Sequence, residues 1–133
     1  MSVAITFYDG VGCIGGNKIL MEDGESALFL DFGINFKAEG MFFDEFLGPR
    51  SGFGFYDLLA LDILPPLEGL YITDLEYPGV WERYSSHPRY RKTEVQGILL
   101  SHAHYDHCGH LSYVREDVPV ITNLTAAVIC KAL

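Results

Sequence analysis

Ten consecutive positions, SHAHYDHCGH at 101–110, hold four of the five histidines in this 133-residue chain. The stretch follows directly on the apolar run GILL at 97–100. A short apolar run of this kind predicts a buried strand, here over 95–101. The strand fixes where the polar segment starts, so the position and spacing of its histidines constrain both the fold and the chemistry.

The spacing within this segment is typical of metal ligands. Imidazole nitrogen and carboxylate oxygen bind divalent transition metals, so His102, His104, Asp106 and His107 are all suitable ligand types. In an extended segment, residues two apart point the same way, which lets His102 and His104 bind one ion. Asp106 and His107 follow where the chain turns toward a helix, and they can reach a second ion. Paired ions of this kind lie about 3.5–4 Å apart and activate a water molecule for hydrolysis.

Two simpler interpretations compete with a two-ion site. The histidines could be incidental surface residues, or they could hold a single structural zinc ion. A structural zinc site favours cysteine-rich ligation, which Cys108 alone does not supply. His87 and His110 lie outside the spaced motif, and we expect them to be surface or supporting polar residues rather than ligands.

The rest of the chain predicts an α/β (α+β) domain over residues 1–133. Patterning predicts strands over 2–8 and 118–122, a hairpin turning at Asp23-Gly24, a surface loop over 81–92, and helices over 56–64, 109–116 and 124–133, the last capped by Asn123. The run GVGCIG at 10–15 matches a dinucleotide-binding pattern, but that pattern must open a helix. A hairpin follows it here, so we expect a flexible loop.

Charge and composition narrow the function further. Eighteen acidic against nine basic residues give a net charge of −9, which repels a polyanion unless cations gather locally or metal is bound. The main concentration of positive charge includes Arg89, Arg91 and Lys92, which are candidate substrate contacts. Three widely spaced cysteines predict no disulfide framework. The chain shows neither a membrane-spanning run nor a signal peptide, so we expect a cytoplasmic protein and no membrane partner.

The motif H-x-H-x-D-H after an apolar strand resembles the signature of the metallo-β-lactamase superfamily. Its continuation, DHCGHLSYV, resembles the β-CASP nucleases of the ribonuclease J and cleavage and polyadenylation factor type. The opening stretch GVGCIGGNKILMEDGESALFLDFG also resembles the beginning of these nucleases. The resemblance covers about 1–33 and 95–133, whereas 34–94 match no functional motif.

The resemblance implies an αββα sandwich, two Zn²⁺ ions and hydrolysis of RNA phosphodiesters. It also implies that Asp31 supports the metal ligands, and that Asp106 accepts a proton from the nucleophilic water. Members of the superfamily supply further ligands downstream, and β-CASP members insert a cap domain. We therefore expect this chain to be the amino-terminal part of a longer enzyme, inactive by itself, with its metal site empty or partly occupied.

Half a sandwich would expose an apolar sheet face, so we expect the isolated chain to self-associate. Candidate residues for that face, or for the core behind it, are Leu28, Leu30, Ile98 and Val120. Two other functions stay open. The same motif serves hydrolases of thioesters, lactones and β-lactams, and a catalytically silent assembly partner is also conceivable, although the intact motif argues against it.

Overall fold

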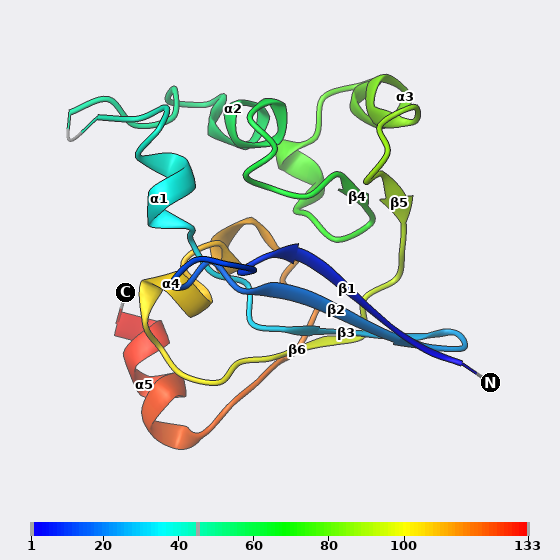
Figure 1. Ribbon diagram of the computed structural model, residues 1–133, viewed down its shortest axis with the longest axis vertical. Helices are drawn as coiled ribbons and strands as arrows, with labels where there is room; N and C mark the ends of the chain where they lie inside the picture. Colours follow the sequence, from blue (N-terminus) through cyan, green and yellow to red (C-terminus); the bar gives the residue numbers. More distant parts are fainter. Residues whose placement is uncertain (1, 45, 133) are drawn as a thin grey trace.

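The computed structural model describes residues 2–44 and 46–132, and its centre is a five-stranded mixed sheet (Figure 1). The strand order is β1-β2-β3-β6-β7, with bounds Val3–Asp9, Lys18–Asp23, Ser26–Leu30, Gly97–Leu99 and Val120–Ile121. β1, β2 and β3 pair antiparallel, whereas β6 runs parallel to both β3 and β7. The predicted α/β class is confirmed, and the sheet is consistent with part of a metallo-β-lactamase fold.

The amino-terminal strands form as the sequence predicts. β1 occupies all but the first residue of the predicted 2–8 strand and extends to Asp9. β2 and β3 form the predicted hairpin, in which Asp23 pairs with Ser26 across a two-residue turn. Gly24 adopts a φ of 62° in that turn, a left-handed conformation that glycine reaches without strain.

The segment between β3 and β6 contains short elements. They are α1 (Phe36–Glu39), α2 (Gly54–Ala60), β4 (Leu67–Glu68), the 3₁₀ helix η1 (Thr73–Leu75), α3 (Val80–Tyr84) and β5 (Arg91–Lys92). The helix predicted over 56–64 is α2, which begins two residues earlier and ends at Ala60. It ends there because the chain takes a left-handed φ of 60° at Asp62, before Pro65 is reached.

The prediction of a surface loop over 81–92 is wrong in part, because α3 and β5 both include residues of this range. Val80 is buried and anchors α3, so the aromatic and charged residues after it begin in a helix rather than a loop. At the other end of the segment, β5 pairs parallel with β4 in a separate two-stranded sheet. Neither element could be recognised among the charged residues of this segment, because neither is long enough to show a hydrophobic period.

The core lies between one face of the five-stranded sheet and this middle segment (Figure 1). Leu20, Phe29 and Ile98 project from three neighbouring strands and are fully buried. Residues of the middle segment complete the same cluster, among them Leu58, Leu64, Leu67 and Tyr71. The sequence between 34 and 94, which matched no functional motif, therefore supplies the layer that covers this face.

The opposite face carries an apolar row that crosses all five strands. Pairing in register places Phe7, Ile19, Leu30, Leu99 and Ile121 next to one another in that order. Phe7 and Ile121 at its two ends are 57% and 55% exposed. Of the residues predicted for an open face, Leu30 belongs to this row and Leu28 lies on the same face. Ile98 belongs to the core instead, and Val120 is exposed at the β7 edge.

The last third of the chain alternates strand and helix, as predicted. β6 leads into α4 (Tyr105–Cys108) and η2 (Leu111–Tyr113), and β7 leads into α5 (Leu124–Ala132). The helix predicted over 109–116 is wrong, because the chain becomes helical earlier, inside the histidine motif, and only a 3₁₀ turn follows Gly109. The predicted cap of α5 is confirmed, since Asn123 Oδ1 accepts a hydrogen bond from the Ala126 amide at 3.0 Å. Among the described residues, no helix has the length and apolar character needed to cross a membrane.

Candidate metal centre

The histidine motif lies at the carboxyl end of β6, beside the ends of two parallel neighbours. Leu99, the last residue of β6, pairs with Leu30 at the end of β3 and with Ile121 at the end of β7. Residues 100–104 continue past the strand, and α4 begins at Tyr105. Side chains that follow β3 and β6 therefore meet at one edge of the sheet, where ligands of parallel sheets commonly bind.

The structure brings the four predicted ligands together. The ring of His102 lies 4.7 Å from that of His104 and 4.0 Å from that of His107, between ring centroids. Asp106 Oδ2 lies 3.6 Å from Nε2 of His107. His104 is exposed, and the other three side chains are half-buried. The cluster is therefore open to solvent on one side.

The buried carboxylate of Asp31 contacts this cluster at His107 and at the neighbouring Ser101. Its carboxylate accepts hydrogen bonds from the Ser101 amide at 2.7 Å and from the Ser101 hydroxyl at 2.9 Å, and lies 2.7 Å from Nδ1 of His107. Asp31 is 6% exposed, and its φ of 58° turns the chain at the end of β3. A carboxylate only accepts, so Nδ1 of His107 carries a proton, and in the neutral ring Nε2 is then the nitrogen that can bind a metal ion. The supporting role of Asp31 toward a metal ion stays a prediction, for which these contacts supply the geometry.

A glycine-rich loop, residues 10–16, packs against Asp106. The Gly16 amide donates to the Asp106 carbonyl at 2.8 Å. A Cβ atom at Gly15 would lie 2.5 Å from Asp106 Oδ2, and one at Gly33 would overlap the Asp106 backbone. The loop predicted to be flexible therefore fits closely around a predicted ligand. One usable signal for this fit is the number of glycines, at positions 10, 12, 15, 16 and 33.

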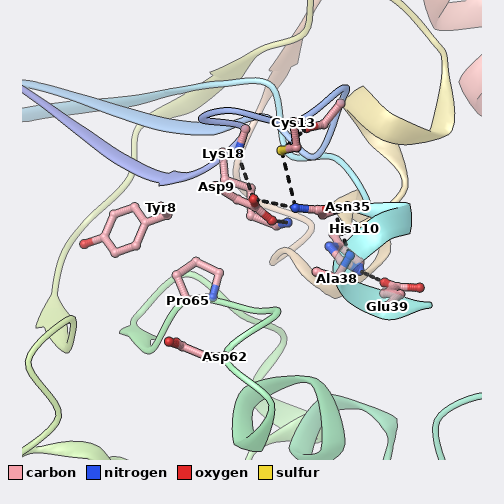
Figure 2. Close-up of polar contacts among 12 residues, drawn as sticks. Tyr8, Asp9, Cys13, Lys18, Asn35, Ala38, Glu39, Asp62, Pro65 and His110 are labelled. Carbon is pink, nitrogen blue, oxygen red and sulfur yellow. Dashed lines mark hydrogen bonds and ion pairs between the residues drawn. The ribbon is translucent and has the colours of Figure 1, made fainter. Parts of the chain in front are cut away.

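A buried polar network supports the same loop (Figure 2). The Lys18 ammonium is fully buried and lies 3.6 Å from Asp9 Oδ2. Asp9 Oδ1 accepts a hydrogen bond from Asn35 Nδ2 at 2.8 Å, and this amide also approaches the Cys13 sulfur at 3.5 Å. Burial lowers the pKa of Lys18 to about 8, although the Asp9 carboxylate opposes the shift. A Cβ at Gly16 would meet Asn35, so the network and the loop fit against each other.

The four clustered side chains fit zinc by their donor chemistry. Three imidazoles and one carboxylate are ligand types that Zn²⁺ prefers. Within residues 2–44 and 46–132, however, no group of three or more histidine, cysteine, aspartate or glutamate side chains is arranged to hold a metal ion by itself. The sequence predicted two ligands from this chain for each ion, and that assignment stays a prediction.

The other two histidines lie apart from the motif. His110 is 2% exposed, so it is not the surface residue that the sequence allowed, and its Nε2 lies 2.9 Å from Glu39 Oε1. Burial lowers the pKa of His110, while Glu39 opposes the shift. His87 Nδ1 accepts from the Arg89 amide at 3.2 Å in the turn after α3. Cys108 is buried, and burial with the adjacent Cys130 thiol raises its pKa to about 11.

The three candidate substrate contacts are engaged with carboxylates of other segments. Arg89 Nη1 lies 3.0 Å from Asp62 Oδ2. Arg91 pairs with Glu22, and Lys92 Nζ lies 2.6 Å from Glu68 Oε1. These ion pairs neutralise much of the local positive charge. A role of Arg89, Arg91 and Lys92 in substrate binding therefore stays a prediction.

Comparison with known proteins gives distant matches to one enzyme. Ribonuclease J of Helicobacter pylori, from strains 26695, B128 and J99, is 29% identical over 117 residues, which cover 88% of this chain. This chain spans only 12% of the length of those relatives. No family model matches the sequence.

A solved structure matches nearly the whole chain. It is the crystal structure of a protein of unknown function from Enterococcus faecalis V583, with a TM-score of 0.63 and 29% identity. The match covers 92% of this chain and 26% of that one. By sequence, this chain is distantly similar to ribonuclease J, a metallo-β-lactamase/β-CASP nuclease, over a segment of fragment size.

Proposed function

We propose that this chain is the amino-terminal part of a metal-dependent hydrolase that, when complete, cleaves RNA phosphodiesters. The observation that carries the proposal is the convergence of His102, His104, Asp106 and His107 at the end of β6, in a chain related to ribonuclease J. The name of that relative supplies the substrate class. The small share of each relative that the chain spans supports a longer complete protein.

In this proposal two Zn²⁺ ions bind at the motif. His102 and His104 hold one ion, Asp106 and His107 hold the other, and further ligands come from outside this chain. When bound, the ions supply an activated water molecule and neutralise charge that develops on the phosphoryl oxygens. A pair of ligands for each ion is half of an ordinary zinc coordination sphere.

The residues of this chain would hold and orient the reacting groups. Asp31 fixes the ring of His107 through the 2.7 Å contact to Nδ1. Asp106, whose Oδ2 lies 3.6 Å from Nε2 of His107, would accept a proton from the attacking water. Of the candidate phosphate contacts, Lys92 is the most exposed, with a side chain 77% accessible, and RNA would have to displace Glu68 from it.

Hydrolysis of a labelled single-stranded RNA tests this function against the small-molecule alternatives. The 133-residue chain and a form extended by the downstream sequence of its gene are assayed with Zn²⁺ on RNA and on thioester, lactone and β-lactam substrates. We expect the extended form to cleave RNA and the short chain to be inactive. His104→Ala should abolish cleavage, whereas His87→Ala should not. Thioester or lactone hydrolysis with RNA left intact would overturn the proposal.

Metal content of the 133-residue chain tests the half-site separately. Each missing ligand removes coordination energy, so zinc should remain bound only partly, or not at all, after dialysis. Elemental analysis measures this directly. Two fully retained zinc ions per chain would show that the described ligands form a complete site, which contradicts the half-site.

A further inference from the structure

Ser101 stands between the buried carboxylate and the first histidine of the motif. Its hydroxyl oxygen lies 2.9 Å from Asp31 Oδ2 and 2.9 Å from Nδ1 of His102. Its backbone amide donates to Asp31 Oδ1 at 2.7 Å, which fixes the position of the residue. The hydroxyl also approaches Nδ1 of His107 at 3.4 Å, a weaker contact than the 2.7 Å between that nitrogen and Asp31.

The direction of these hydrogen bonds follows from the number of protons. A serine hydroxyl has one proton to donate and can accept from other groups. Asp31 has none to donate, so the hydroxyl proton must lie between Ser101 Oγ and Asp31 Oδ2, as otherwise two oxygens would face each other at 2.9 Å with no proton between them. Ser101 Oγ then can only accept from His102, and Nδ1 of His102 must carry the proton.

We infer that Ser101 is a positioning residue that extends the control of Asp31 to His102. Through it, one buried carboxylate sets the tautomer of two imidazoles, directly at His107 and by relay at His102. Both rings then present an unprotonated Nε2 on the side away from Asp31. The inference rests on the proposed function only for what the two nitrogens bind, since the relay itself is a property of the chain without metal.

The relay explains how two histidines assigned to different ions can both depend on the same carboxylate, Asp31. In the proposed site, His102 and His107 bind different zinc ions, yet the hydrogen bonds of the Ser101 hydroxyl, which contacts His102, and of His107 both end on Oδ2 of Asp31. Without the hydroxyl, His102 would lose its acceptor, and its proton would be free to move to Nε2, the nitrogen needed as a ligand. Hydrogen-bond partners of metal-bound histidines commonly have such effects on affinity.

Nitrogen NMR of the chain labelled at histidine tests the relay in the absence of metal. Correlations between ring protons and both ring nitrogens, recorded near pH 8.5, where free imidazole is ordinarily neutral, distinguish the two tautomers. We expect His102 to carry its proton on Nδ1 in the native chain and to shift toward the Nε2 form in Ser101→Ala. His107 should keep its tautomer in both. Ser101→Thr retains a hydroxyl and should restore the native signals at His102.

Two results would overturn the inference. One is an Nε2-protonated His102 in the native chain, and the other is an unchanged His102 in Ser101→Ala. Ser112→Ala, at an exposed serine in η2, is the matched control and should leave His102 unaffected. The backbone amide spectrum reports whether each variant keeps the fold, and Ser101→Thr tests the relay even if the alanine variant does not fold.

Zinc affinity provides a second measurement. Competition with a chromophoric chelator should show about 10-fold weaker binding for Ser101→Ala than for the native chain, with most of the loss recovered in Ser101→Thr. Equal affinities in all three would count against the relay. The NMR measurement needs neither zinc nor RNA, so failure of the RNA assay would sink the proposed function and leave the assignment of Ser101 standing.

Discussion

The Asp31 carboxylate lies 2.7 Å from Nδ1 of His107, although 76 positions separate the two residues in the sequence. The contact joins the end of β3 to α4. It exists because β3 and β6 are parallel neighbours, which brings the residues that follow each strand to the same edge of the sheet. The candidate metal centre therefore depends on a pairing between distant parts of the chain, and the histidine motif alone does not complete it.

Loss of the Asp31 carboxylate should lower zinc affinity and activity more than it lowers the stability of the fold. In the complete protein, we expect Asp31→Ala to lower zinc affinity or activity by about 10- to 100-fold, because His107 loses the acceptor that orients its ring. Elemental analysis and turnover measure the effect. Asp117→Ala, at an exposed aspartate that pairs with Arg115, is the control. Native zinc stoichiometry together with native turnover in Asp31→Ala would refute the role of Asp31.

Two glycines of the 10–16 loop form a matched pair for testing its fit to Asp106. Gly12 and Gly15 have nearly the same φ, 71° and 73°, so alanine is strained by the backbone at both. At Gly15 the new Cβ would also press on Asp106, whereas at Gly12 nothing lies within 4 Å. Gly15→Ala should therefore lower the melting temperature and zinc affinity clearly more than Gly12→Ala. Equal effects would mean that the loop yields without moving Asp106.

The buried Lys18 should make stability rise with pH in a narrow window. Its pKa is lowered by burial to about 8 in the folded chain, against an ordinary value of 10.5. Between these values the unfolded chain binds more protons than the folded one, so the free energy of unfolding increases, by about 1 kcal/mol from pH 8 to pH 9.

Urea unfolding at the two pH values measures this increase. Lys18→Met removes the titrating group and should remove the rise, while Lys131→Met, at an exposed lysine near the end of α5, should retain it. Cys108, whose pKa burial raises from 9.0 to about 11, contributes with the opposite sign from about pH 9, where its thiol ionises in the unfolded chain, so the difference between the native chain and Lys18→Met is the measure of the lysine contribution. A fall in stability from pH 8 to pH 9 in the native chain would contradict the assignment to Lys18.

The apolar row on the open face of the sheet should drive self-association of the isolated chain. Phe7 and Ile121, each more than half exposed, lie at its two ends. Light scattering should show mass increasing with concentration, and Ile121→Lys should reduce the increase. Phe36→Lys, at an exposed phenylalanine on α1, is the control. A monodisperse native monomer from micromolar to millimolar concentration would contradict this expectation.

The elements with a clear hydrophobic pattern could be predicted from sequence. β1, the β2–β3 hairpin and the capped α5 were all expected, because each has a period or a turn signal that is complete within a few residues. α3 and β5 could not be predicted in the same way. α3 has five residues and β5 has two, and they are stabilised through distant contacts, α3 by burial of Val80 and β5 by pairing with β4.

In the candidate site, too, the features that depend on local sequence could be predicted, and those that depend on contacts between distant segments could not. The four candidate metal ligands could be selected from spacing and ligand chemistry, since they lie within six positions of one another. The parts that surround them could not, because the fit of Gly15 to Asp106 and the place of Ser101 beside Asp31 arise only when distant segments meet. Burial of His110 was missed for the same reason, as its partner Glu39 belongs to α1.

The parallel pairing of β3 with β6 also has a kinetic consequence. These strands can pair only after residues 31–96 have closed into one long loop, and contacts of such sequence separation slow folding. The β1–β2–β3 meander needs only short turns and can form earlier. Refolding should therefore produce the hairpins first and the edge that carries the histidine motif last, so a newly made chain would present its histidines in an ordered array only at the end of folding.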